Sequence, residues 1–208
     1  MPVVTIRGQL GSGGLEIGRL VADKLNADFV DRRIIAEVAV ILDKRRRDVK
    51  EKEMPPGSLL GRIAELLGRS YFLGVDNLGV FMPVSEIPLK DTRYLEGLRS
   101  VIGNLAFSQA IVIYGRGSQF ILKDHPTAFH VLVVAPLELR VERVVEDMNL
   151  NKDAAKKEIE RYDSSRREFI KRYFQEKLED PVNYDLVINT EHLGFDEAAS
   201  IVVNALPF

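Results

Sequence analysis

The sequence contains no cysteine and no tryptophan, and it has three histidines among 208 residues. The absence of cysteine excludes disulfide bonds, thiolate metal sites and cysteine nucleophiles. The histidines, His125, His130 and His192, do not have the spacing of a metal-binding motif such as HExxH. The chemistry of this chain must therefore come from other residue types, and no metal-ligating residue is predicted.

An excess of charge of one sign and long apolar runs are also missing. The formal net charge is −2, so no overall field attracts nucleic acid or an anionic membrane. No apolar stretch approaches the roughly 20 residues needed to span a bilayer, and no signal peptide is visible. We therefore expect a single cytoplasmic domain with no nucleic-acid or membrane partner, in which any anion site is a local cluster.

Short apolar runs alternate with helical patterns along the chain. Strands are predicted at VVTI (3–6), ADFVD (27–31), AIVIY (110–114), AFHVLVVAP (128–136) and YDLVINT (184–190). Helices are predicted over 15–25, 32–42, 59–69, 91–110, from Pro136 onward, over 151–177 and over 195–206. This order predicts an α/β fold with a parallel sheet covered by helices on both faces.

Ligands of such sheets bind beyond the carboxyl ends of the strands. The stretch GQLGSGGLEIGR begins at Gly8, directly after the first predicted strand. Gly8 and Gly13 have the spacing of a loop that wraps its backbone N–H groups around a phosphate, and the following helix adds partial positive charge. However, Gly14 and Leu15 occupy the positions of the usual Lys and Ser or Thr.

Two other interpretations of this loop remain open. It can be a tight turn without a ligand. It can also be a dinucleotide-binding loop with Asp31 as the ribose-binding acid, although Glu16 stands where the third glycine of GxGxxG belongs.

Arginines follow the third strand and fill the long helical region. Arg116 lies between two glycines after a predicted buried strand, where its guanidinium suits a phosphate or, alternatively, a salt bridge. In the region 151–177, Arg166 falls within an apolar face and needs an anionic partner. Arg161, Arg167 and Arg172 surround it, and Ser164–Ser165 is a candidate hinge. This region is either a basic flap over phosphates or a pair of helices with internal ion pairs to Glu168 or Glu176.

In this order and spacing, several stretches resemble the cytidylate kinase-like family of P-loop nucleoside monophosphate kinases. They are VTIRGQLGSGGLEIG, FVDRRII, IVIYGRG, VVAPLELRVERV, EIERYDSSRREF and DPVNYDLVINT. The resemblance implies a three-layer α/β/α fold with a five-stranded parallel sheet. It also implies a monophosphate-binding insert at about 31–90 and a lid at about 149–180.

The resemblance further implies roles for particular residues, with ATP and Mg²⁺ as cofactors and nucleotides as partners. The donor-binding set is Gly8, Gly11, Ser12, Gly13, Gly14, Leu15 and Arg143. The acceptor-binding set is Asp31, Arg93 (with Thr92) and Arg116. The catalytic set is Arg116 with the lid arginines Arg161, Arg166 and Arg167.

The chain departs from relatives of this family beside the loop. They commonly carry a basic residue at the position of Leu15, and Ser-Arg where this chain has Arg7-Gly8. Arg7 is a candidate replacement, but a strand residue one position earlier points to the other face of the sheet. Two hypotheses follow: a nucleoside monophosphate kinase, or a non-catalytic nucleotide-binding protein on the kinase fold.

Overall fold

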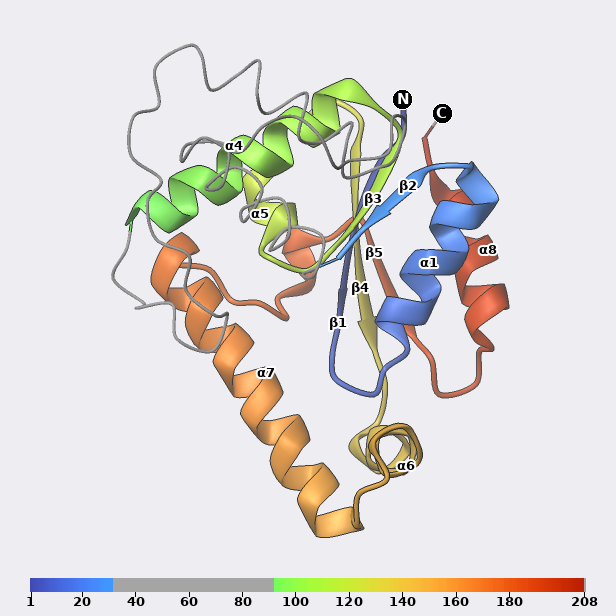
Figure 1. Ribbon diagram of the computed structural model, residues 1–208. Helices are drawn as coiled ribbons and strands as arrows, with labels where there is room; N and C mark the ends of the chain where they lie inside the picture. Colours follow the sequence, from blue (N-terminus) through green and yellow to red (C-terminus); the bar gives the residue numbers. More distant parts are fainter. Residues whose placement is uncertain (32–91, 208) are drawn as a thin grey trace, which may run out of the picture. The chain divides into compact units, whose positions relative to one another are not determined.

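The computed structural model describes residues 1–31 and 92–207 (Figure 1). The helices predicted over 32–42 and 59–69 lie outside the described residues. The chain divides into two compact units, one formed by Met1–Phe29 with Ala110–Phe208 and the other by Val30–Gln109. The predicted division of one domain into an insert and a lid stays a prediction.

A five-stranded sheet organises the fold, with strand order β2-β3-β1-β4-β5. The strands are β1 (Val3–Gly8), β2 (Asp28–Val30), β3 (Ile111–Tyr114), β4 (Ala128–Val134) and β5 (Leu186–Asn189). Strand β1 is central and pairs in parallel with β3 and β4, with Val3 opposite Ile111 and Ala128. Strand β5 pairs in parallel with β4. The predicted α/β fold with a parallel five-stranded sheet is confirmed.

Helices α1 (Gly14–Leu25) and α8 (Phe195–Ala205) lie side by side against one face of the sheet (Figure 1). Side chains alternate between the faces of a strand, so Val4 and Ile6 of β1 point toward these helices. They form a buried core with Ile17, Val21 and Val202. This core fixes the start of α1, and hence the glycine-rich loop, at the end of β1.

The opposite face of β1 carries polar side chains. Thr5 Oγ1 and His130 Nδ1 are 2.8 Å apart, and Arg7 lies beside helix α7 (Lys152–Phe174). The short helix α5 (Ser118–Ile121) follows β3, and its Phe120 stacks on Phe174 at the end of α7 with ring centroids 5.3 Å apart. The expectation that Arg7 points away from the α1 face is confirmed.

Helix α7 is one uninterrupted helix. Asn151 caps its start by accepting a hydrogen bond from the Ala154 amide at 2.9 Å. Its helical hydrogen bonding continues through Ser164 and Ser165, so these residues are not a break between two helices. Both are exposed, and serine is tolerated on the water-facing side of a helix.

Apolar residues at helical spacing predict the core face of helix α6 (Leu137–Met148): Leu137, Val141, Val144, Val145 and Met148. The structure corrects this prediction at both ends of the helix. Leu137 and Met148, which the helical spacing places in the core, are 44% and 45% exposed, whereas Arg140 is only 7% exposed. The helix packs on α7 and on the loop residue Leu10, through a cluster that contains Val141 and Val144. Arg140 can be buried in their company because a carboxylate of α7 neutralises it.

The second unit contributes helix α4 (Thr92–Ser108), whose Leu98, Ile102 and Leu105 are buried at helical spacing. Among the residues that the structure describes, no helix combines the length and the apolar character required to cross a membrane.

Candidate phosphate-binding site

The glycine-rich loop connects β1 to α1 by a left-handed turn. Gly13, the N-cap of α1, has φ +82°, and Gly11 has φ +79°. A Cβ on Gly13 would lie 2.2 Å from Cε1 of Phe195, so the position has no room for a side chain. Both the dihedral angles and the packing therefore require glycine here.

The backbone carbonyls from Gln9 to Gly13 all accept hydrogen bonds within the protein. Those of Gln9 and Gly13 accept hydrogen bonds from the amides of Ser12 (3.0 Å) and Ile17 (2.9 Å). The next three accept from side chains: Leu10 from Arg140 (3.3 Å), Gly11 from Arg143 (3.2 Å) and Ser12 from Thr190 (2.9 Å). The first amides of a helix have no acceptor within the helix. The amides of Gln9, Leu10 and Ser12 are already bonded inside the protein, to Val133, Asp163 and Gln9. The donors suited to phosphate are therefore the amides at the positive end of α1, which begins at Gly14.

The two ends of the loop are in close contact. A Cβ on Gly8 would lie 2.9 Å from the Cα of Gly14 and 3.2 Å from the hydroxyl of Tyr114. Burial, followed by interaction with Tyr162, raises the pKa of Tyr114, so this phenol stays protonated beside the loop. A neutral hydroxyl there can donate to an anion without repelling it.

Arg143 holds the outside of the loop. Its guanidinium donates to the Thr190 side chain at 2.9 Å and to the Thr190 carbonyl at 3.0 Å, and it lies 5.0 Å from the ring centroid of Phe195. These contacts tie the loop to the end of β5. A role of Arg143 near a donor base stays a prediction.

The loop offers no direct ligand for Mg²⁺. The Ser12 hydroxyl is fully buried and donates to the Gln9 carbonyl at 2.8 Å, and Leu15 has no oxygen. The described residues also contain no group of three or more His, Cys, Asp or Glu side chains that could hold a metal ion. The residues present therefore do not fit a protein-bound magnesium ion at this loop.

Arg116 occupies a strained turn after β3. Gly115, Arg116 and Gly117 have φ values of +78°, +60° and +68°. Left-handed geometry costs a residue with a side chain about 1–3 kcal/mol, and such strain is concentrated at functional sites. The glycines on either side let the chain make the turn, and Arg116 alone carries a side chain in it.

The three predicted lid arginines lie on α7 and differ in their contacts. Arg161 is exposed and pairs with Glu158 at 2.6 Å. Arg167 donates to Ser164 at 3.1 Å and lies 3.6 Å from the Glu179 carboxylate. Arg166 is half-buried and stacks on the Tyr162 ring, 3.6 Å from its centroid. The ring thus supports Arg166 and leaves the donors at the guanidinium edge available.

Asp163, which is not among the predicted site residues, is the buried charge on α7. It is 3% exposed. Its carboxylate accepts from Arg140 at 2.6 Å and from the Leu10 amide at 3.2 Å, and it lies 3.8 Å from Arg7. One carboxylate thus joins the loop, α6 and α7. Its position four residues after Ile159, on the apolar face, is the signal that could have identified it.

The remaining predicted acceptor residues are Asp31, Thr92 and Arg93. Asp31 follows β2 directly, as expected. Thr92 and Arg93 begin helix α4, of which only the backbone is described at these residues. Their roles stay predictions.

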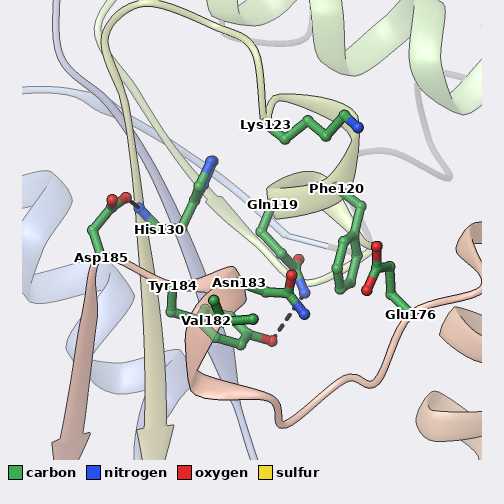
Figure 2. A pocket seen from close by; sticks show the side chains of 9 residues that line it. All are labelled: Gln119, Phe120, Lys123, His130, Glu176, Val182, Asn183, Tyr184 and Asp185. Carbon is green, nitrogen blue, oxygen red and sulfur yellow. Dashed lines mark hydrogen bonds between the residues drawn. The ribbon is translucent and has the colours of Figure 1, made fainter.

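A separate cavity of about 250 Å³ lies beside the first residues of β4 and β5, near α5 and the short helix η1 (Pro181–Asn183) (Figure 2). Its lining includes Lys123, His130 and Tyr184, and none of the predicted phosphate-binding residues. The Tyr184 hydroxyl accepts a hydrogen bond from Gln119 at 3.0 Å and donates to the Leu178 carbonyl. Burial raises the pKa of Tyr184 to about 12.

His130 makes the stability of this region depend on pH. Burial lowers the pKa of His130 below its usual value, while nearby Asp185 partly opposes the change. The unfolded chain therefore binds a proton at His130 more tightly than the folded protein does. The free energy of unfolding is highest above about pH 6.5, where the histidine is neutral, and it decreases as the pH falls. We expect the melting temperature to fall between pH 7 and pH 5 more steeply for the wild type than for His130→Asn. Parallel melting curves would contradict this.

Comparison with known proteins identifies the family. Residues 3–192 match the cytidylate kinase-like family. The chain is 33% identical over 163 residues to a cytidylate kinase of Desulfurococcus amylolyticus, covering 71% of this chain and 86% of that protein. It is also 33% identical over 98 residues to a uronate isomerase of Corynebacterium glutamicum, but this covers 47% of the chain and spans only 19% of the isomerase.

A solved structure of an uncharacterised protein from Eubacterium ventriosum covers 99% of the chain with a TM-score of 0.71 and 17% identity, and it supports the fold alone. The match over residues 3–192 and the cytidylate kinase relative agree on the same family. The chain belongs to the cytidylate kinase-like family.

Proposed function

We propose that the protein is a nucleoside monophosphate kinase that transfers the γ-phosphoryl group of ATP to CMP or a related monophosphate. The observation that carries this proposal is the geometry of the loop. Its carbonyls from Gln9 to Gly13 are all hydrogen-bonded within the protein, and the left-handed Gly13 starts helix α1 directly after the loop. We expect the donor phosphates to bind the first amides of α1, which have no acceptor within the helix. The kinase name of the Desulfurococcus amylolyticus relative supports the same reaction class.

In this reaction the protein contributes mainly by positioning the substrates and supplying positive charge, and little by covalent chemistry. An oxygen of the acceptor phosphate forms a bond to the γ-phosphorus, and the bond from that phosphorus to the bridging oxygen of ADP breaks. Arg116 is proposed to hold the acceptor phosphate, and Arg161, Arg166 and Arg167 to neutralise the charge that develops on the transferring group. Any magnesium ion would be held by nucleotide and water, because the Ser12 side chain is fully buried and Leu15 has no oxygen.

Removing either key arginine should weaken phosphate binding while the fold remains intact. We expect Arg116→Ala and Arg166→Ala each to lower the affinity for phosphate-bearing ligands about 10- to 100-fold, because a hydrogen bond to a charged group contributes about 1.5–3 kcal/mol. Isothermal calorimetry with ATP and CMP measures this. The matched control is Arg172→Ala, which removes an exposed arginine from α7, the helix that carries Arg166. Unchanged affinity in both variants would identify Arg116 and Arg166 as structural residues.

The experiment that tests the function is turnover. Purified protein is incubated with ATP, Mg²⁺ and each nucleoside monophosphate, and diphosphate and ADP are quantified. Absence of turnover with every acceptor, in a sample shown to be folded, would reject the kinase.

A second candidate is a nucleotide-binding protein without catalysis. Gly14 and Leu15 favour it, because the loop itself carries no cationic side chain and no accessible metal-binding hydroxyl. It predicts nucleotide binding in calorimetry without diphosphate formation.

A further inference from the structure

Arg7 is a buried arginine whose donors are incompletely used. Its side chain is 6% exposed. Within the described part of the chain, its Nε and Nη2 atoms are buried and have no hydrogen-bond partner. A buried guanidinium is costly unless an anion or acceptor meets its N–H groups, so this arrangement calls for a partner.

The neighbouring carboxylate does not supply that partner. Asp163 is already bonded to Arg140 at 2.6 Å and to the Leu10 amide at 3.2 Å. Its distance to Arg7 Nη2 is 3.8 Å, which is longer than a hydrogen bond. Two guanidinium groups thus share one carboxylate, and the buried cluster keeps an excess positive charge.

This excess charge lies next to the loop. Arg7 directly precedes Gly8, and the Leu10 amide belongs to the same cluster. The Tyr114 hydroxyl, which approaches Gly8, is near enough to Arg7 for the positive charge to oppose the burial that raises the pKa of this phenol. The Arg7 guanidinium is also 6.0 Å from the ring centroid of Tyr162 on α7.

We propose that Arg7 is a polyphosphate-binding residue that replaces the cation missing at Gly14, using its unpaired N–H groups on the phosphates that the loop binds. The inference rests on the proposed function, since it assumes that the loop from Gly8 to Gly14 holds a nucleoside triphosphate. Asp163 orients Arg7 from one side. Because the N–H groups of Arg7 are incompletely paired, its guanidinium can bind a second, stronger anion.

The binding role and a purely structural role predict different melting temperatures for Arg7→Met. If Arg7 stabilises the fold as an ion pair with Asp163, Arg7→Met lowers the melting temperature of the ligand-free protein. If Arg7 is held for a ligand, replacing a buried, underpaired charge with an apolar side chain of similar length leaves that temperature unchanged or raises it.

The test measures binding of sodium tripolyphosphate and of ATP by calorimetry, with melting curves in the absence of ligand. We expect Arg7→Met to lower both affinities about 10- to 100-fold, the loss of a charged hydrogen-bonding group, without lowering the melting temperature. Arg7→Lys, which keeps the charge, should retain more affinity than Arg7→Met. Arg19→Met removes an exposed arginine of α1 and should leave both affinities unchanged.

The outcomes separate this inference from the proposed kinase. The inference is overturned if Arg7→Met binds tripolyphosphate and ATP as tightly as the wild type. It is also overturned if Arg7→Met fails to fold properly and Arg7→Lys binds no more tightly than Arg7→Met. Both conclusions hold even if the wild type phosphorylates CMP. Arg7-dependent tripolyphosphate binding without turnover of any monophosphate supports the inference and rejects the kinase. A wild-type protein that binds neither tripolyphosphate nor ATP overturns the inference.

Discussion

Asp163→Ala is expected to destabilise the protein by about 3–5 kcal/mol, the usual cost of removing one partner from a buried ion pair. The variant leaves the guanidinium groups of Arg7 and Arg140 buried without a carboxylate, and it deprives the Leu10 amide of its acceptor. Chemical denaturation measures the change in the free energy of unfolding. It should be accompanied by weaker ATP binding, because the loop loses one of its fixed points.

Matched variants separate the charge effect from the loss of a side chain on α7. Glu160→Ala removes an exposed carboxylate three residues away and should change stability by about 0.5 kcal/mol or less. The double variant Asp163→Leu with Arg140→Met replaces the closest pair by apolar groups and should be more stable than Asp163→Ala. A loss below about 1 kcal/mol for Asp163→Ala, typical of exposed pairs, would contradict the role assigned to this carboxylate.

Gly13→Ala is expected to lower the affinity of the glycine-rich loop for phosphate ligands strongly. A methyl group at this residue would meet the Phe195 ring at 2.2 Å, and φ is +82°. The left-handed geometry alone costs about 1–3 kcal/mol, and the loop must also move away from the ring. If that cost falls on the binding-competent loop, ATP affinity drops by more than about 100-fold, which calorimetry can measure.

Two comparisons isolate the cause of this effect. Gly103→Ala places a methyl group in helix α4 where no described atom beyond the helix's own backbone lies within 4 Å. It should stabilise the protein by about 0.5–1 kcal/mol without changing ATP affinity. Phe195→Ala in the Gly13→Ala background relieves the clash and leaves the dihedral strain, so it should restore affinity in part. Normal ATP affinity in Gly13→Ala would show that the loop does not form the phosphate site.

The framework of the fold was predictable because it depends on local patterns. Apolar runs such as IVIY and LVVA gave central strands, and the spacing of Ile17 and Val21 placed α1 on the sheet. The loop was predictable for the same reason, since Gly11 and Gly13 need a geometry that other residues avoid. Periodicity and turn chemistry are properties of neighbouring residues, and a single sequence contains them.

The contacts around the loop could not be predicted because they join residues far apart in the chain. Helical periodicity drew attention to Arg166, which lies half-buried on Tyr162, whereas the buried charge of the same face is Asp163. Arg140 resembles any surface arginine until Asp163 is placed beside it. Pairing of this kind depends on how α6 and α7 pack, which no short stretch of sequence specifies.

The hydrogen bond from Leu10 to Asp163 has a consequence for folding during synthesis on the ribosome. The two residues are separated by 153 positions, so the loop that is synthesised first is tied down only when helix α7 has emerged. Contacts between such distant parts form late, because the entropy cost of closing a long loop of chain comes before the contact can stabilise the fold. A nascent chain that ends before α7 carries every glycine of the loop and lacks its anchor. The glycine-rich loop can therefore reach its anchored geometry only after synthesis has passed α7.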